Sequence, residues 1–355
     1  MHLAAWGDVW YPRLLPMKVA LDASPLVEPS GGTRRYVMEL HRALTECFPE
    51  DEFRLVSDQF PRPASWLARR WWLAGVQFEM RRLGTEVFHG TDFSVPYLPT
   101  KPSVLTLHDL SPWLDPAWHS KAGRIRHRTP FLLRLGLATM VITHTEAVRR
   151  QAIERFLLSP SRVAAIPLAA APHFRRTSPP DGSYFLYVGT LEPRKNLPAL
   201  VEAWREVRRK HPIDFVLAGR AREDAPKIAP EPGLRLLGPV DEERLPELYS
   251  GALACLYPSF YEGFGLPVLE AMQCGAAVLA SRDAAIAEVA GDAAALTEAS
   301  DVRGWAEAMT RAVTDEAWVE NLRRRAADRA RRYSWERTAR ATYEVYKEAV
   351  ARFGW

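Results

Sequence analysis

The strongest constraint on the fold of this chain is an alternation of short apolar runs with longer amphipathic segments. An apolar run of a few residues has the length of a buried strand, whereas an amphipathic segment of about 10 residues or more has the length of a helix. Short, fully apolar strands separated by helices are typical of βαβ units, in which helices cover a parallel sheet. The sequence therefore predicts an α/β protein with parallel sheets.

The expected elements fall into two groups. The first group has strands at residues 19–22, 53–57, 87–89, 104–107 and 140–143, and a helix at 34–44. The second group has strands at residues 184–188, 213–218, 234–237, 253–257 and 276–280, and helices at 197–210, 241–249 and 266–273. The chain after residue 301 is expected to be helical. Two such groups indicate two Rossmann-like domains that face each other across a cleft.

A polar, proline-rich stretch at residues 175–182 separates the two groups. Such a stretch cannot pair into a sheet and is typical of a linker. The composition changes at the same point: residues 1–176 have a net charge of +7, the remainder has −3, and eight of the nine histidines precede residue 177. We therefore place a domain boundary there.

Missing motifs exclude several classes of protein. The three cysteines are widely spaced without a C-x-x-C, which disfavours a disulfide framework or a cysteine zinc site and fits a reducing cytosol. No H-E-x-x-H or G-x-x-x-x-G-K-[ST] motif occurs, nor the D-x-D with which one large class of sugar transferases holds a metal. No apolar run has transmembrane length, so we expect a cytoplasmic protein. Residues 1–16, before the strand that follows Met17, are interpreted as a tag or an upstream start.

Ligands of open α/β sheets bind outside the carboxyl ends of the strands, so the residues after each strand are the site candidates. Gly31 and Gly32 lead into a helix, where backbone N–H groups and the helix dipole favour an anion. A tight turn would equally explain the glycine pair. His108 follows the strand at 104–107, where it could contact a sugar hydroxyl, transfer a proton or be a buried structural histidine.

A basic pair follows the first strand of the second group. Arg194 and Lys195 stand at the entrance to the helix at 197–210, a few residues after Thr190. A planar guanidinium and a compact ammonium together suit a diphosphate, although basic pairs are also common on solvated surfaces. Their place on the ligand side of a strand favours an anion site.

The richest stretch is Y-E-G-F-G-L-P-V-L-E-A-M at residues 261–272. Glu262 lies in a glycine-rich loop and Glu270 about one turn into the helix that the loop opens. A loop carboxylate can bind sugar hydroxyls, and a helix carboxylate can bind a ribose diol. Glu270 stands in an otherwise apolar run, where a carboxylate is costly without a partner, so an exposed surface glutamate is disfavoured there.

Several motifs together resemble family 4 of the glycosyltransferases, which are retaining enzymes of the GT-B architecture. The resemblance extends from Met17 to about Tyr346. The motifs are G-G-T-R-R-Y (31–36), H-D-L (108–110), V-G-T-L-E-P-R-K-N (188–196), the 261–272 stretch and E-V-A-G-D-A-A (288–294). One departure is Val148, which replaces the second serine of a V-S-x-x-S segment that this family often has.

The resemblance implies a role for each candidate residue. Residues 17–177 would form the acceptor domain and 178–334 the donor domain, with a C-terminal helix at 335–355 packing back on the first domain. The implied catalytic residues are His108, Arg194, Lys195 and Glu262. The implied donor-binding residues are Gly31, Gly32, Thr190, Arg194, Lys195, Val240, Glu262, Gly263, Phe264, Gly265, Leu266 and Glu270. Among them Arg194 and Lys195 would hold the diphosphate, Glu270 the ribose, and Glu262 and His108 the sugar.

The expected activity is therefore transfer of a hexose, with retention, from a nucleotide diphosphate sugar of the GDP-mannose or UDP-glucose type to a glycan or lipid-linked acceptor. No cofactor and no metal are expected, because the nucleotide sugar is a substrate. Two alternatives are a nucleotide-sugar epimerase and a non-catalytic sugar-binding protein of the same architecture. A pyridoxal-dependent phosphorylase is disfavoured, because Lys195 alone among the four lysines after residue 176 lies on the expected ligand side.

The first half of the chain also carries a strongly basic segment. Residues 62–176 contain 17 Lys or Arg and 7 Asp or Glu. Residues 66–72 combine aromatic and basic residues at helical spacing, and Arg124 and Arg126 belong to a second basic cluster at 121–128. Interfacial helices have this composition, although tryptophans in a core and arginines on a solvated face would also explain it. An anionic acceptor or peripheral association with the inner face of a membrane is thus expected, and nucleic acid is not.

Overall fold

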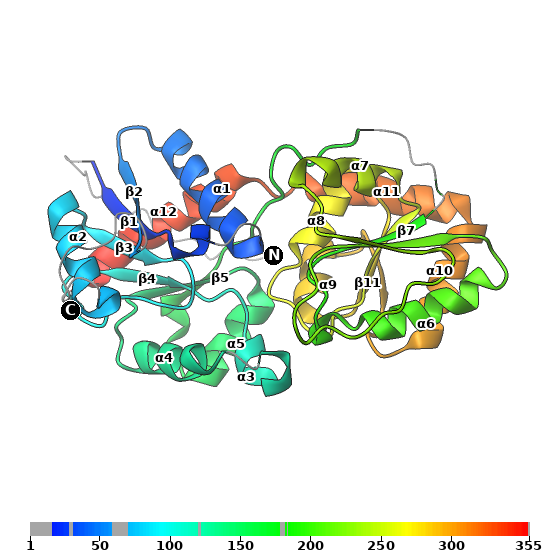
Figure 1. Cartoon of the computed structure of the whole chain (residues 1–355). Coiled ribbons are helices and arrows are strands. Elements are labelled where there is room, and N and C mark those ends of the chain that lie inside the picture. Colours follow the sequence, from blue (N-terminus) through cyan, green and yellow to red (C-terminus); the bar gives the residue numbers. More distant parts are fainter. Residues whose placement is uncertain are drawn as a thin grey trace.

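The computed structural model describes residues 16–27, 31–58, 70–119, 122–177, 182 and 184–353. Two six-stranded sheets form the centres of two lobes that lie side by side (Figure 1). All the strand pairs within these sheets are parallel, with the orders β2-β1-β3-β4-β5-β6 and β12-β11-β10-β7-β8-β9. The α/β class with two Rossmann-like sheets is confirmed.

The first lobe is built around short strands, and those in the middle of its sheet are buried along their whole length. Its strands are β1 (Lys18–Asp22), β2 (Glu52–Val56), β3 (Val87–Gly90), β4 (Ser103–Thr106), β5 (Met140–Thr143) and β6 (Val163–Ala165). Its helices include α1 (Gly32–Cys47), α2 (Val76–Leu83), α3 (Ser111–Leu114), α4 (Gly123–Arg134) and α5 (Glu146–Phe156), with a 3-10 turn η3 (Pro116–Trp118). Helices on both faces explain why these strands carry so few polar residues.

The second lobe is likewise a parallel sheet covered by helices. Its strands are β7 (Tyr184–Val188), β8 (Asp214–Ala218), β9 (Leu234–Gly238), β10 (Ala254–Tyr257), β11 (Val278–Ser281) and β12 (Ala295–Thr297). Its helices are α6 (Leu197–Arg208), α7 (Leu245–Gly251), α8 (Leu266–Gln273), α9 (Ala284–Ala290), α10 (Val302–Thr314) and α11 (Glu316–Ala330), with 3-10 turns η5 (Pro193–Lys195) and η6 (Glu242–Arg244).

The last helix, α12 (Trp335–Arg352), returns from the second lobe and packs along α1 of the first (Figure 1). Ser334 caps its start by accepting a hydrogen bond from the N–H of Arg337 at 3.2 Å. Tyr346 is fully buried, and its hydroxyl lies 2.7 Å from Nδ1 of His89 at the end of β3. The chain therefore crosses between the lobes twice, once after β6 and once before α12.

The structure departs from the sequence predictions at three points. The edge strands β6 and β12 are only three residues long and were not predicted, because so short a run has no readable period. Trp71 is buried against the first sheet and belongs to the core, which bears out the second of the two interpretations of these tryptophans and not the interfacial one. Trp66 and Arg69 of the same segment lie outside the described residues. No helix in the described part of the chain is long and apolar enough to cross a bilayer.

Candidate functional site

The carboxyl ends of strands from both sheets meet between the lobes. Gly263, in the loop after β10, lies so close to the first lobe that a Cβ added to it would be 2.0 Å from the backbone oxygen of His108, after β4. Thr145, after β5, donates its hydroxyl to the backbone oxygen of Gly263 at 3.1 Å. Only glycine permits this approach, so the loop predicted to bind the donor is also the point where the lobes touch.

Arg194, Lys195 and Glu262 form a buried ionic cluster next to this contact. Each has less than a tenth of its surface exposed. One oxygen of Glu262 lies 3.1 Å from a terminal nitrogen of Arg194, and the other accepts a hydrogen bond from the ammonium of Lys195. The Lys195 ammonium also donates to the hydroxyl of Tyr257 at 2.9 Å. The three charged residues predicted from two separate motifs are therefore one cluster.

A fourth charge, Glu192, completes the cluster and was not predicted. Its carboxylate accepts from Arg194 at 2.8 Å and from Arg222 at 2.6 Å. Glu192 has extended backbone angles just before the turn η5, which brings its side chain beside that of Arg194 two residues later. The sequence signal was the glutamate within the same motif as the basic pair.

Burial and neighbouring positive charges have opposite effects on the pKa of Glu262. Burial raises the pKa of its carboxyl, but the positive charges of Arg194 and Lys195 outweigh burial and bring the pKa to about 2. Glu262 is therefore ionised at neutral pH, and it holds both cations in place. A buried carboxylate that loses such partners costs several kcal/mol, so the cluster fixes the geometry of the loop.

Glu270 lies on α8 and is 1% exposed. One of its oxygens accepts from the Tyr249 hydroxyl at 3.0 Å, and the other is ion-paired with a terminal nitrogen of Arg35, on α1 of the first lobe. Burial raises the pKa of the Glu270 carboxyl, and Arg35 opposes that rise. The prediction that this carboxylate needs a partner is thus met by a residue from the other lobe.

His108 has a partner on each ring nitrogen. Nε2 lies 2.7 Å from the backbone oxygen of Thr91, which can only accept, so Nε2 carries the proton. Nδ1 lies 2.9 Å from Nε2 of His144, a buried histidine whose pKa burial lowers well below its usual value. Sequence analysis missed His144 because the segment at 143–148 was compared with the family motif only for its hydroxyl groups. In this arrangement His108 is oriented by its neighbours, and its contact with a sugar stays a prediction.

The remaining predicted donor residues lie around the same interface. Gly31 caps α1 with a φ of 136°, and a Cβ on Gly32 would be 3.8 Å from Leu266 of the second lobe. Gly265, with a φ of 91°, precedes α8, and Phe264 is buried beside it. Thr190 is exposed after β7, and Val240 is partly buried after β9. The structure therefore brings Gly32 and Leu266 together, while Thr190 and Val240 follow two strands, β7 and β9, that β8 separates.

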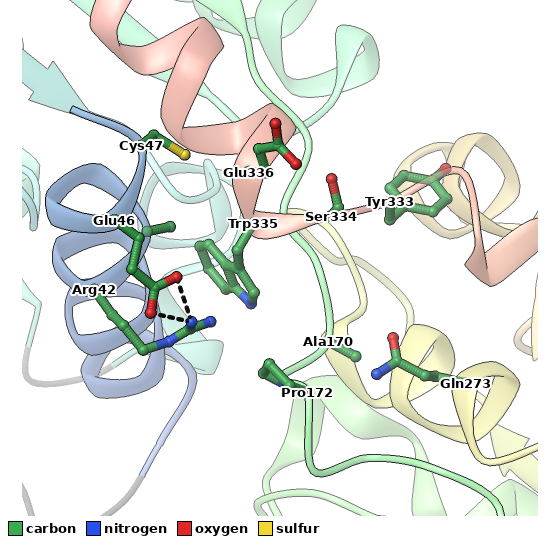
Figure 2. A pocket seen from close by; sticks show the side chains of 11 residues that line it. Arg42, Glu46, Cys47, Ala170, Pro172, Gln273, Tyr333, Ser334, Trp335 and Glu336 are labelled. Atoms are coloured by element: carbon green, nitrogen blue, oxygen red, sulfur yellow. Dashed lines mark hydrogen bonds and ion pairs between the residues drawn. The ribbon is translucent and has the colours of Figure 1, made fainter. Parts of the chain in front are cut away.

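One cavity, of about 280 Å³, lies away from the ionic cluster, beside the crossing into α12 (Figure 2). Figure 2 shows Trp335 between Arg42 of α1 and Pro172 of the other crossing segment. The indole N–H of Trp335 has no hydrogen-bond partner among the described residues. This cavity lies where α1 meets the two segments that cross between the lobes. Within the described ranges, no group of three or more His, Cys, Asp or Glu residues is placed to hold a metal ion.

Comparison with known proteins assigns the family. Residues 171–333 match the family described as "Glycosyl transferases group 1". The O-antigen chain mannosyltransferase B of Escherichia coli is 30% identical to this chain, over 93% of this chain and 100% of that protein. The chain belongs to the group 1 glycosyltransferases. The serotype-specific mannosyltransferase WbdA of Escherichia coli is 29% identical, over 69% of this glycosyltransferase but only 33% of WbdA.

Solved structures share the fold of this glycosyltransferase. A sucrose-phosphate synthase from Thermosynechococcus elongatus superimposes with a TM-score of 0.72 at 20% identity, covering 95% of this chain and 100% of that one. Anabaena HepE, solved with UDP and glucose, superimposes with a TM-score of 0.69 at 16% identity, covering 94% and 100%. The architecture of the chain is therefore GT-B, as the resemblance implied.

The close approach at Gly263 generates a prediction. Gly263→Ala should lower kcat at least about tenfold, because the added methyl group collides with the backbone at His108 and keeps the lobes apart. Steady-state kinetics measure this loss. Gly123→Ala on α4 is the matched control, since nothing lies within 4 Å of its Cβ position. An unchanged kcat in a folded Gly263→Ala protein would show that the reaction does not require this contact between the lobes.

Proposed function

We propose that this glycosyltransferase moves a mannose from a nucleotide diphosphate sugar, with GDP-mannose as the first candidate, to a hydroxyl of a growing polysaccharide. The observation that carries the proposal is the match to O-antigen chain mannosyltransferase B along the whole of that relative. The buried ionic cluster supports it, because Arg194 and Lys195 supply two cations at the carboxyl end of a strand. A non-catalytic protein would have no need to keep these costly groups buried.

In this proposal the second lobe, within residues 178–334, holds the donor. The diphosphate lies against Arg194 and Lys195 and near the N-terminus of α8. Glu270 accepts the ribose hydroxyls, and Glu262 accepts hydroxyls of the sugar. The first lobe, within residues 17–177 together with α12, holds the acceptor and presents His108 and the Gly31–Gly32 turn to the donor.

The reaction proposed here retains the anomeric configuration. As the bond between the sugar and the diphosphate breaks, negative charge grows on the leaving phosphate oxygen. Arg194 and Lys195, already positioned by Glu192 and Glu262, stabilise that charge without reorganisation. The leaving phosphate accepts the proton of the attacking hydroxyl on the same face of the sugar. Contact between the lobes excludes water, which would otherwise hydrolyse the donor.

A panel of nucleotide sugars tests the function. Thermal-shift screening with GDP-mannose, UDP-glucose and UDP-N-acetylglucosamine should give stabilisation by one donor, of roughly 2.7 kcal/mol at 100 times its dissociation constant. That donor should be turned over in the presence of excess chelator, and NMR of the product should show a retained anomeric configuration. Epimerisation of the donor without an acceptor would instead identify an epimerase, and loss of activity that Mg²⁺ or Mn²⁺ restores would disprove metal independence.

Two substitutions should separate binding from chemistry. Glu270→Ala should act mainly on the donor Michaelis constant, because a ribose contact exists before the reaction. Lys195→Ala should lower kcat roughly 100-fold or more, because its charge faces an oxygen whose charge grows in the transition state. Lys210→Ala, at an exposed lysine, is the control. A Lys195→Ala enzyme with changed donor Michaelis constant and normal kcat would refute the role given to Lys195.

A membrane-facing surface is the second part of the proposal. The helix α4 has no acidic residue, and its outer side exposes Arg124, His127, Phe131 and Arg134, with Leu135 just beyond it. Basic and large apolar side chains on one exposed face are typical of interfacial helices. This surface replaces the tryptophan-based one expected from the sequence, since Trp71 is buried.

Arg126, named with Arg124 in the expected basic cluster, has an internal function. Its guanidinium donates to the backbone oxygens of Pro112 and His119 and so holds the segment between α3 and α4. Arg128 stacks on Trp72, with 5.5 Å between the guanidinium carbon and the ring centre. Substituting these two arginines would disturb the fold, so the membrane test uses other residues.

Vesicle co-sedimentation tests this surface. Binding should rise with anionic lipid and fall with salt, since each basic residue near such a surface contributes about 1 kcal/mol that salt screens. The combined Arg124→Ser, Phe131→Ser and Arg134→Ser variant should lose most binding. Arg303→Ser with Arg311→Ser on α10 removes charge from the other lobe and should bind normally. Absence of vesicle binding at low salt would favour an acceptor free in solution.

A further inference from the structure

Arg35 connects the two lobes through two carboxylates of the second lobe. Its terminal nitrogen pairs with Glu270 on α8, and its Nε pairs with Glu242 of η6 at 3.0 Å. The guanidinium also lies over the ring of Phe174, with 5.2 Å between its carbon and the ring centre. The Arg35 side chain is 16% exposed and that of Glu270 1%, so this pair is buried, whereas the Glu242 end of the bridge is 42% exposed.

In this structure Tyr249 and Arg35 cover the Glu270 carboxylate, so that a ribose cannot reach it. Tyr249 occupies one oxygen, Arg35 occupies the other, and the side chain is 1% exposed. A ribose diol binds a carboxylate by donating hydrogen bonds to its oxygens, which requires them to be reachable. The arrangement in the structure is therefore incompatible with a ribose on Glu270.

We infer that Arg35 occupies the nucleoside part of the donor site in the ligand-free enzyme and must leave Glu270 before the donor binds. This inference rests on the proposed function, because it takes Glu270 as the ribose-binding residue. Arg35 and the ribose then compete for one carboxylate. The competition lowers the apparent donor affinity by the fraction of molecules in which the bridge is open.

The same exchange couples donor binding to the arrangement of the lobes. Arg35 belongs to α1, whose first turn contains Gly32 against Leu266, so release of Arg35 loosens the contact of α1 with the second lobe. The cavity beside Trp335 lies between the C-terminal half of α1 and the crossing segments (Figure 2). By thermodynamic linkage, opening the Arg35 bridge increases donor affinity by the same factor by which donor binding favours the open bridge.

Two substitutions open the bridge without removing Glu270. Arg35→Met removes the competitor, and Glu242→Gln weakens its second anchor. Both should lower the dissociation constant of GDP, the nucleotide of the first-candidate donor, about fivefold in isothermal titration, with a smaller change in kcat. Hydrogen exchange at residues 32–36 of the ligand-free protein should increase in both variants. In the wild-type protein, GDP should produce the same increase.

Two matched controls accompany these variants. Arg34→Met changes the neighbouring arginine, which donates to the backbone oxygen of Leu26 within the first lobe. Glu243→Gln removes the same charge one position further along η6, at an exposed residue. Neither control should change GDP affinity. The comparison separates the Arg35 bridge from a general effect of charge on nucleotide binding.

Any result other than tighter GDP binding in the Arg35→Met and Glu242→Gln variants overturns the inference. Weaker GDP binding in Arg35→Met and Glu242→Gln would make Arg35 a donor ligand, and unchanged binding would make the bridge purely structural. If the wild-type protein binds GDP and Glu270→Ala abolishes binding while Arg35→Met does not improve it, this inference alone fails. If the wild-type protein binds none of the nucleotide sugars in the panel, the proposed function fails with it.

Discussion

The site depends on a set of ionised side chains that are kept out of water. Arg194 and Lys195 are held by Glu192 and Glu262, and each of the four has less than a tenth of its surface exposed. Such charges are stable only as a set, because removing one leaves another buried without a partner. The backbone meets this requirement in two places. The turn η5 carries both cations, and the loop after β10 brings Glu262 back to them. In the proposed reaction, this preorganised cationic site would stabilise the leaving diphosphate without first reorganising water.

Most of the fold and much of the candidate site could be predicted from the sequence. Apolar runs located ten of the twelve strands, because buried parallel strands differ sharply from amphipathic helices. The candidate site was also recognisable, since Glu262, Glu270, Arg194 and Lys195 stand in motifs directly after strands. The sequence did not predict β6 or β12, whose three residues have no readable period.

The partners across the lobes were the part that sequence reasoning missed. Arg35 lies in a recognised motif, yet nothing in its neighbours indicates a contact with Glu270, which is 235 positions away. The same holds for Glu288 of α9, whose carboxylate accepts from the N–H groups of Glu146 and Ala147 at the start of α5 at 2.8 and 2.9 Å. Such pairs depend on how the two lobes are placed, which local propensity does not determine. The burial of Trp71 was also not predictable, because composition alone does not distinguish a core tryptophan from one at a membrane interface.

The path of α12 affects how the chain acquires its structure. The first lobe has its complete core only when Tyr346 has reached His89, near the very end of the chain. During synthesis, the core of the lobe that is begun first is therefore completed only after all the strands of the second sheet have been made. A chain that stops before Trp335 would retain every strand of both sheets but leave α1 without its packing partner. The first lobe thus depends on a helix that is made only after the whole second lobe.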